Sequence, residues 1–447
     1  MDRKYYFVQK GPHPLIPSPI RRGEIVDVVF LERKFMRLIL FFLIILIVAT
    51  SAVYADNWPE FRGPTNNGHA KSSNLPLKWS EKQNIKWKVP IHDRGWSTPV
   101  VWGDQIWMTT ASEDGKQMYA VCVSLKTGEM IHDVKIFDNE NLPRIASMNS
   151  YASPSPVIEE GKVYVHFGSF GTACLNTNSG DVLWQRRDII CDHEEGPGSS
   201  PVLFENLLIL TMDGGDVQYL EALDKKTGKT VWKTNRSTDW PEENDYRLAF
   251  GTPLIVDISG NPQLVTTGSK SAWSYDPNTG NEIWQVRYAG WSNSSRTVAH
   301  EDMVYINTGF DDPQLWAVRL GGKGDVTDSH VVWKIEKDAP KIPSPIIFDG
   351  LIYMTSDKGI LTCHDAVSGE LFWREGLGGT YIASPIYANG AIYFFDHKGK
   401  TTVIKPGKTF ELLAENQLDD GFMASPAVFG NSLILRTKTH LYRIEKQ

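Results

Sequence analysis

A repeated phrase determines what this chain can fold into. Each copy opens with a small residue and Pro, continues through short apolar strands, and ends in a Thr/Ser-Gly turn and an apolar strand with Trp, as from Ser200-Pro201 to Trp232. The openers recur at Pro99, Pro156, Pro201, Pro253, Arg296, Pro345, Pro385 and Pro426. Their spacing of 40 to 57 residues is the period of a propeller or a solenoid.

Within each copy the apolar runs indicate strands. Runs such as 207–210 and 392–395 are short, β-rich and bounded by Gly, Asn or Asp, and no long helical period accompanies them. Four strands in each of eight copies predict an all-β, eight-bladed β-propeller of four-stranded antiparallel blades. The last copy stops before its Trp strand, whereas 84–89 has that pattern with no strands before it. We therefore expect residues 79–447 to form the propeller, closed by this N-terminal strand, after an N-terminal segment at 56–78.

The first 55 residues lie outside the repeat. Basic residues before an apolar run at 38–49 and a small-residue site ending at Ala55 predict a signal peptide over 36–55, cleaved near Ala55. Residues 1–35 are interpreted as a non-native N-terminal extension with Met36 as the true start, although an unusually long n-region is the alternative. The mature chain is expected in the periplasm or secreted, as a monomer without a transmembrane span.

The net charge and the cysteine positions argue against a nucleic-acid partner and against disulfide bonds. Residues 56–447 carry 38 Lys and Arg against 49 Asp and Glu, a formal charge of −11, which argues against nucleic acid as a partner. Cys122, Cys174 and Cys363 each lie six residues before a turn glycine, so they occupy one strand position in different blades. Together with Cys191 they are expected to be buried structural thiols rather than disulfides.

The repeated tryptophans could serve as a stacking surface for sugars or bases. Their regular place in the repeat instead predicts packing between neighbouring blades. No phosphate loop, helical zinc motif or nucleophile elbow is present, and no metal site is expected.

Residues just before each opener should gather at one mouth of the central channel, because the innermost strands of a propeller all run in the same axial sense. This ring of candidate ligand-binding residues comprises Arg94, Trp96, Asn149, Tyr151, His193, Glu194, Arg247, Trp291, Asn293, Arg296, Lys341, Tyr381 and Phe422. Its cations and aromatic rings suit an anionic or carbohydrate ligand. A merely solvated channel mouth remains the alternative.

Arg296 stands where the other openers have Pro. A guanidinium at this point suits an oxyanion, with Arg247 and Lys341 from the adjacent blades nearby. The other interpretation is an Arg paired with a carboxylate inside the channel. If Arg296 binds a ligand, Arg296→Pro should leave folding nearly intact and weaken an anionic ligand about tenfold.

The repeats resemble the pyrroloquinoline-quinone-like (PQQ-like) propeller repeats of quinoprotein alcohol dehydrogenases and of the propeller lipoprotein of bacterial outer-membrane assembly. The segments 58–64 and 324–327 are similar to markers of a secreted bacterial subgroup. For a dehydrogenase the resemblance implies PQQ with calcium, a vicinal Cys-Cys disulfide, a Trp platform and a Glu, Asn and Asp ligand set. No two cysteines here are adjacent.

Three functions follow from these observations. The first is an exported, non-catalytic binding or scaffold module for an envelope protein, a polysaccharide or an anionic ligand, with no cofactor. The alternative is a PQQ-dependent quinoprotein dehydrogenase of alcohols or sugars, for which Asn149 and Glu194 are candidate oxygen ligands near the mouth that do not match the calcium set of that family. The third is a hydrolase or lyase, for which His193 with Glu194 or Glu195 is the sole obvious cluster, and no catalytic residue can be assigned.

Overall fold

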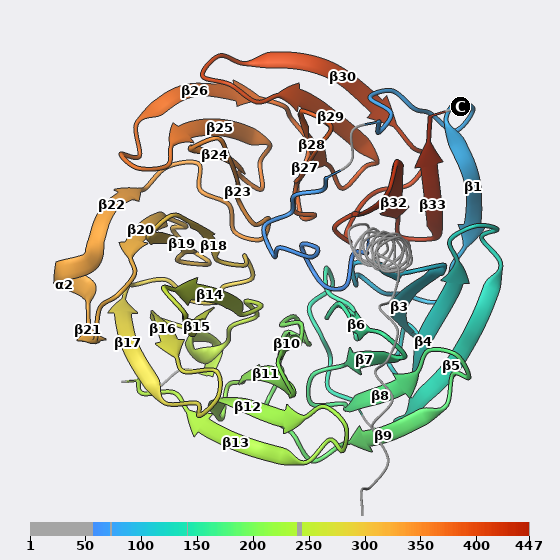
Figure 1. Ribbon diagram of the computed structural model, residues 1–447, viewed down its shortest axis with the longest axis horizontal. Helices are drawn as coiled ribbons and strands as arrows, with labels where there is room; N and C mark the ends of the chain where they lie inside the picture. Colours follow the sequence, from blue (N-terminus) through green and yellow to red (C-terminus); the bar gives the residue numbers. More distant parts are fainter. Residues whose placement is uncertain (1–56, 72–73, 141, 239–243, 447) are drawn as a thin grey trace, which may run out of the picture. The chain divides into compact units, whose positions relative to one another are not determined.

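The computed structural model describes residues 57–71, 74–140, 142–238 and 244–446. The chain divides into two units, Met1–Ala55 and Asp56–Gln447, and the expected extension and signal peptide lie outside the described residues. In the second unit, the described residues form eight sheets arranged around a ring (Figure 1). This confirms the eight-bladed propeller. Among the described residues, no helix has the length and apolar character needed to cross a membrane.

The first four blades run from Val100 to Arg287. Blade 1 contains β2 (Val100–Trp102), β3 (Gln105–Ala111), β4 (Gln117–Ser124) and β5 (Met130–Asp138). Blade 2 contains β6 (Val157–Glu159), β7 (Lys162–His166), β8 (Thr172–Asn176) and β9 (Val182–Arg186). Blade 3 contains β10 (Val202–Phe204), β11 (Leu207–Asp213), β12 (Gln218–Asp224) and β13 (Thr230–Asn235). A 3₁₀ turn, η1 (Asn244–Arg247), precedes blade 4, which contains β14 (Leu254–Ile258), β15 (Asn261–Thr267), β16 (Ser271–Tyr275) and β17 (Glu282–Arg287).

The other four blades complete the ring. Blade 5 contains β18 (Val298–His300), β19 (Met303–Asn307), β20 (Leu315–Arg319) and β22 (Val331–Ile335). Blade 6 contains β23 (Ile346–Phe348), β24 (Leu351–Thr355), β25 (Ile360–Asp365) and β26 (Leu371–Gly376). Blade 7 contains β27 (Ile386–Ala388), β28 (Ala391–Phe395), β29 (Lys400–Lys405) and β30 (Glu411–Gln417). Blade 8 contains β31 (Ala427–Phe429), β32 (Ser432–Arg436), β33 (His440–Glu445) and β1 (Ile85–Pro90).

Strand composition follows from the position of each strand in its blade. The second strand β11 is buried at every residue, because neighbouring blades cover both of its faces. The outermost strand β13 alternates between exposed and half-buried residues, as expected for a strand with one face in water. The middle strands therefore supply most of the interblade core.

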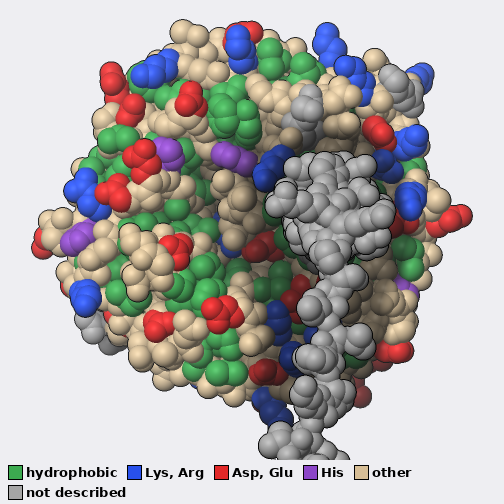
Figure 2. Space-filling model, viewed as in Figure 1, with side chains coloured by type: hydrophobic (Ala, Val, Ile, Leu, Met, Phe, Trp, Pro, Cys, Tyr) green, Lys and Arg blue, Asp and Glu red, His purple; other side chains and the backbone are tan. Residues whose placement is uncertain are grey.

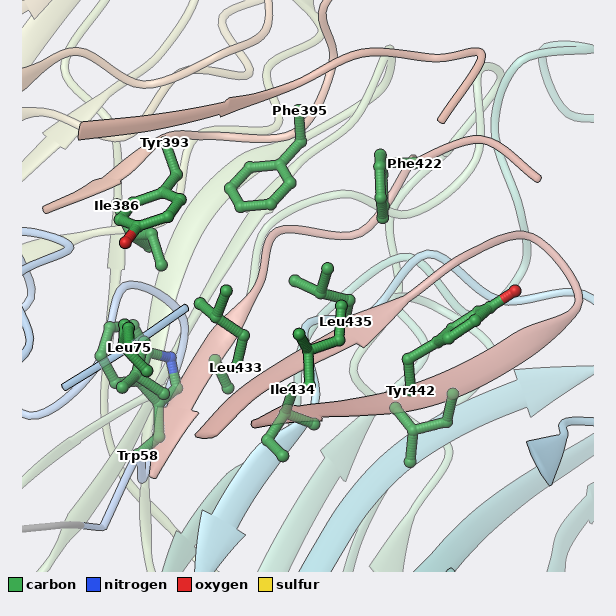
Figure 3. Packing of buried hydrophobic residues seen from close by; sticks show 14 of the residues in the cluster. Trp58, Leu75, Ile386, Tyr393, Phe395, Phe422, Leu433, Ile434, Leu435 and Tyr442 are labelled. Atoms are coloured by element: carbon green, nitrogen blue, oxygen red, sulfur yellow. The ribbon is translucent and has the colours of Figure 1, made fainter. Parts of the chain in front are cut away.

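The ring is closed as the sequence predicted. β1 pairs antiparallel with β33, with Val89 opposite Leu441 and Lys88 opposite Tyr442. Figure 3 shows the core at this junction, where Trp58 and Leu75 from the N-terminal segment pack with Leu433 of blade 8. The strand at the front of the domain thus removes the edge that the last copy leaves unpaired.

The repeated tryptophans connect five of the blades to the next one, which confirms their structural role. The indole of Trp184 covers Gly228 and leaves no room for a Cβ there, and the φ of +69° also favours glycine. The Trp184 Nε1 donates to Lys225 O at 3.2 Å. The same bond to a carbonyl of the next blade is made by Trp87, Trp232, Trp333 and Trp373.

Blade 4 departs from this pattern because the next turn is longer. The insertion forms β21 (Gly324–Asp325) and α2 (Thr327–His330), and β21 adds to β17 as a parallel fifth strand. Trp284 therefore turns back to its own blade, where its Nε1 donates to Gln263 Oε1 at 3.1 Å.

The cysteines occupy tight positions inside the blades. All four are buried free thiols, as expected from the sequence. Cys174 of β8 lies between Tyr164 of β7 and Trp184 of β9, so only a small side chain fits between two aromatic neighbours. Cys363 has the same surroundings between Tyr353 and Trp373.

Candidate functional site

A belt of hydroxyl groups joins the blades around the central channel. The residue before most openers is Ser or Thr, and its backbone N–H donates to the side-chain oxygen of the equivalent residue in the next blade. These bonds, at 2.9 to 3.0 Å, run from Thr98 to Ser155, Ser155 to Ser200, Ser200 to Thr252, Ser344 to Ser384 and Ser384 to Ser425. The repeated Ser/Thr-Pro pair therefore links adjacent blades as well as starting each inner strand.

The belt corrects the predicted alignment of the fifth copy. The backbone N–H of Arg296 donates to Ser344 Oγ at 3.0 Å, so Arg296 occupies the belt position and not the Pro position. Each inner strand begins one residue after its opener, and β18 begins at Val298, which places Thr297 at the opener. Because a Pro at 296 lacks this N–H, the variant Arg296→Pro would lose a belt hydrogen bond. It is therefore expected to disturb folding, which the sequence alone did not predict.

The N-terminal segment closes one end of the channel. It crosses the middle of the ring in Figure 1 and contacts inner strands of several blades. Trp58 pairs with Val101 of β2, Pro59 O accepts the N–H of Ile158, and Ala70 N–H donates to Tyr387 O. Every one of these partners lies two residues beyond its opener, so the segment lies at the end of the channel opposite the predicted mouth.

Two buried arginines hold this segment in place. Arg296 Nη1 donates to Phe61 O at 2.5 Å, its Nε donates to Pro253 O, and its Nη2 lies 3.3 Å from Glu60 Oε2. Arg62 donates to Pro345 O and Pro385 O. Arg296 thus makes the buried carboxylate contact that was the alternative to its ligand role.

Burial governs the electrostatics of this cluster. Burial raises the pKa of Glu60 even though Arg296 opposes the change. Burial, together with the charge of Arg296, lowers the pKa of Arg62 to about 9. Two guanidiniums against one carboxylate give this end of the channel a net positive formal charge.

The rest of the channel is a cavity of about 540 Å³ that all eight blades line. Phe61 of the N-terminal segment forms its floor. The residue three positions before each opener faces it in every blade, namely Trp96, Ser153, Gly198, Phe250, Ser294, Ile342, Ile382 and Met423. The channel is therefore open at one end and closed at the other.

The structure brings four of the predicted site residues together in this cavity: Trp96, Asn149, Lys341 and Tyr381. Lys341 Nζ lies 3.9 Å from the Phe310 ring centroid. Asn149 uses its amide within the protein, because Nδ2 donates to Glu195 O and Pro197 O while Oδ1 accepts from Ser153 Oγ.

The other predicted residues lie elsewhere. Arg94 and Tyr151 line a separate hollow of about 220 Å³. His193 is buried in a third cavity, where its ring lies 3.4 Å from Cys191 Sγ and burial lowers its pKa to about 4. Glu194 is exposed, and Arg247 ends η1 with Nη1 3.5 Å from Gly215 O. The expected single ring at the mouth is thus only partly assembled.

Sequence reasoning missed an aromatic series beside the cavity. Tyr246, Trp291 and Phe310 contact edge to face, with centroid separations of 5.0 and 5.5 Å. Lys270 lies over the Tyr246 ring as Lys341 lies over Phe310. Trp291 was in the predicted ring, but Phe310 follows an inner pair of strands and had no repeat signal. We call Tyr246, Trp291 and Phe310 the mouth patch.

The residues of the cavity do not fit the calcium and quinone set implied by the dehydrogenase resemblance. Asn149 is committed to protein contacts, Glu194 does not line the cavity, and the carboxylates of Glu195 and Asp357 belong to different blades. In the described part of the chain, no three His, Cys, Asp or Glu side chains are grouped to hold a metal ion.

Comparison with known proteins agrees with this architecture. Outer membrane protein assembly factor BamB from Yersinia pestis is 22% identical over 268 residues, covering 48% of this chain and 66% of that protein. Tetrathionate hydrolase from Acidithiobacillus ferrooxidans is 19% identical over 259 residues, covering 50% of this chain and 48% of that protein. The chain thus spans less than two thirds of each of these relatives.

Solved structures share the fold at low identity. BamB from Moraxella catarrhalis matches with a TM-score of 0.58 at 11% identity, covering 80% of this chain and 99% of that one. Quinohemoprotein alcohol dehydrogenase from Comamonas testosteroni matches with a TM-score of 0.62 at 12% identity, covering 88% and 81%. The family model described as outer membrane protein assembly factor BamB matches residues 73–234, 216–346 and 325–408. The chain therefore belongs to this BamB family of PQQ-like propellers.

Proposed function

We propose that this protein is an exported, non-catalytic scaffold that binds an envelope protein at the open mouth of its channel. The observation that carries the proposal is the mouth patch, where Phe310 and Tyr246 are 43% and 36% exposed. Large apolar side chains in contact with one another at a surface are typical of protein-binding sites. Membership of the BamB family supports a protein partner, because the family model and the Yersinia pestis relative are described as an assembly factor of the outer membrane.

The geometry of the rings favours a protein over a polysaccharide. A sugar stacks on an open aromatic face, whereas Lys341 already lies over the face of Phe310 and Lys270 lies over that of Tyr246. Trp291 is held between the two rings and donates its Nε1 to Asp311 Oδ2. The patch therefore presents ring edges and charged tips, which suit mixed polar and apolar side chains.

The closed end of the channel supports a binding site at the open mouth. Contacts of the N-terminal segment cover the inner strands at that end, so loops from different blades converge without obstruction only at the other end. On the face drawn in Figure 2, outside the grey atoms, basic and acidic side chains are interspersed without an extended patch of one sign. Periplasmic location and a monomeric state remain part of the same proposal.

Site-specific photocrosslinking in the native envelope tests this function. A photoreactive residue at position 310 should crosslink one discrete envelope protein, whereas the same residue at Val367, which is 54% exposed on blade 6, should not. Once the crosslinked partner has been identified, its affinity for the Phe310→Ala variant should be about tenfold weaker than for wild type, and its affinity for Val367→Ala should be unchanged. Equal crosslinking from both positions would contradict a mouth-specific site.

A further inference from the structure

The closed end of the channel carries a ring of hydrogen-bond donors that its structural role does not use. Six belt hydroxyls line the cavity: Thr98, Ser155, Ser200, Thr252, Ser384 and Ser425. Five of them accept one backbone N–H, and the Thr98 hydroxyl is not used in the belt. In the part of the chain that the structure describes, none of the six O–H groups donates to a protein acceptor.

A hydroxyl can donate one hydrogen bond as well as accept, so each of these groups offers a donor toward the cavity. Six donors from six blades surround one end of a single channel. Groups that converge in this way without an internal acceptor are suited to a bound acceptor, and an anionic oxygen makes the strongest such bonds.

The buried charges next to the hydroxyl ring also favour an anion at the closed end of the channel. Arg296 belongs to the belt itself, and its guanidinium lies next to the Phe61 floor. Arg62 contributes a second buried cation, while Glu60 provides one carboxylate. Because these groups are shielded from water, their field at the floor is less screened than that of surface charges.

The side chains that line the cavity above the belt hydroxyls indicate what the rest of the ligand must be. Trp96, Phe250 and Met423 line the cavity over the hydroxyls, and Lys341 lies farther out beside Phe310. The two carboxylates that line the cavity, Glu195 and Asp357, are not belt residues, and Asp357 accepts the backbone N–H of Lys341 at 3.0 Å. An apolar body with one anionic end therefore fits with its anion on the floor.

We infer that the closed end of the channel binds a carboxylate carried on an apolar or aromatic group. This inference rests on the proposed function, since it describes what enters the same mouth. The channel is closed beyond the hydroxyl ring, so it receives the end of a ligand and does not thread a polymer. The carboxylate can come from a free organic acid or from the carboxy terminus of a partner chain.

Calorimetric titration of the purified protein tests the inference with matched probes. 2-Naphthoate should bind about tenfold more tightly than the neutral 2-naphthalenemethanol, because hydrogen bonds to charged groups are the stronger ones. A short peptide ending in Phe, with a free or an amidated terminus, distinguishes the second source of the carboxylate. Preference for the free acid in either pair supports the site and identifies its source.

The belt offers a matched control for mutation. Ser384→Ala removes a hydroxyl that lines the cavity, whereas Ser344→Ala removes one that accepts the Arg296 N–H and does not line it. Each variant loses one belt bond, so their stabilities should fall alike. Binding of the preferred acid should weaken at least threefold in Ser384→Ala only, and Ser384→Thr should restore it.

Equal affinity for acid and neutral probes, or no binding of either acid, would overturn the inference. Equal loss of affinity in Ser344→Ala and Ser384→Ala would also overturn it, because the ring would then act through stability alone. Crosslinking from position 310 is independent of the channel floor. A discrete crosslinked partner without acid binding therefore leaves the proposed function standing and removes only the carboxylate site.

Discussion

Arg296→Met should loosen the N-terminal segment and destabilise the propeller. The variant retains the backbone N–H that donates to Ser344, so the belt stays intact. It removes the guanidinium bonds to Pro253 O and Phe61 O and leaves the Glu60 carboxylate, whose side chain is 14% exposed, without its cation. Breaking a buried ion pair costs about 3–5 kcal/mol, and the partial exposure of Glu60 places the expected loss near about 3 kcal/mol.

The loss should depend on pH in a defined direction. Burial raises the pKa of Glu60 in the folded protein, so the folded state binds a proton more readily than the unfolded chain. The contribution of such a group to stability falls as pH rises through its folded pKa. Removing Arg296 raises that pKa further, so the destabilisation should be complete at pH 8 and smaller in mildly acidic buffer.

Urea unfolding followed by tryptophan fluorescence measures these changes in wild type, Glu60→Gln, Arg296→Met and the double variant. The double variant should lose less than the sum of the two single losses, because the two side chains interact directly. Additive losses, a cost below about 1 kcal/mol for Arg296→Met, or a loss independent of pH would refute the role of this pair in holding the segment.

Three further predictions concern the blades themselves. Deleting residues 85–90 exposes the edge of β33, so the protein should aggregate in light scattering, and a monodisperse monomer with an unchanged urea midpoint would contradict the role of β1. Trp232→Phe loses the indole bond to Pro277 O and should cost about 1–3 kcal/mol in urea unfolding; an unchanged midpoint would argue against the interblade contact. The four thiols should resist a thiol reagent in the folded protein and all react in denaturant, since burial encloses them and raises their pKa values; fast native labelling would disprove that burial.

The fold could be predicted because its signals are local and repeated. The opener, the turn glycine and the Trp strand lie within one copy, and each marks the same place in every blade. Ring closure was predictable for the same reason, since the strand at 85–90 has the outer-strand pattern and the last copy lacks it. Buried cysteines could be predicted from their fixed distance to the turn.

The site could be predicted only in part, because its contacts are distant in sequence. Glu60 and Arg296 are 236 residues apart, and nothing local to either indicates the pair. Aligning Arg296 with the prolines was natural but wrong by one position, and aligning Val298 with the apolar residue that starts each inner strand gives the correct register. Residues farther than three positions before an opener lie on loops of unequal length. Asn149 therefore still reaches the channel cavity, whereas Arg94 and His193 line other hollows.

Hydrogen–deuterium exchange on the protein, with and without the partner crosslinked through position 310, tests directly whether the partner binds at the open mouth of the channel. We predict slower exchange in the mouth loops at 244–250, 291–294 and 308–311, which carry the exposed patch. Exchange in the N-terminal segment at 58–70, at the closed end, should change less than exchange in these loops. Protection confined to that segment or to the outer strands of the blades would contradict a binding site at the open mouth.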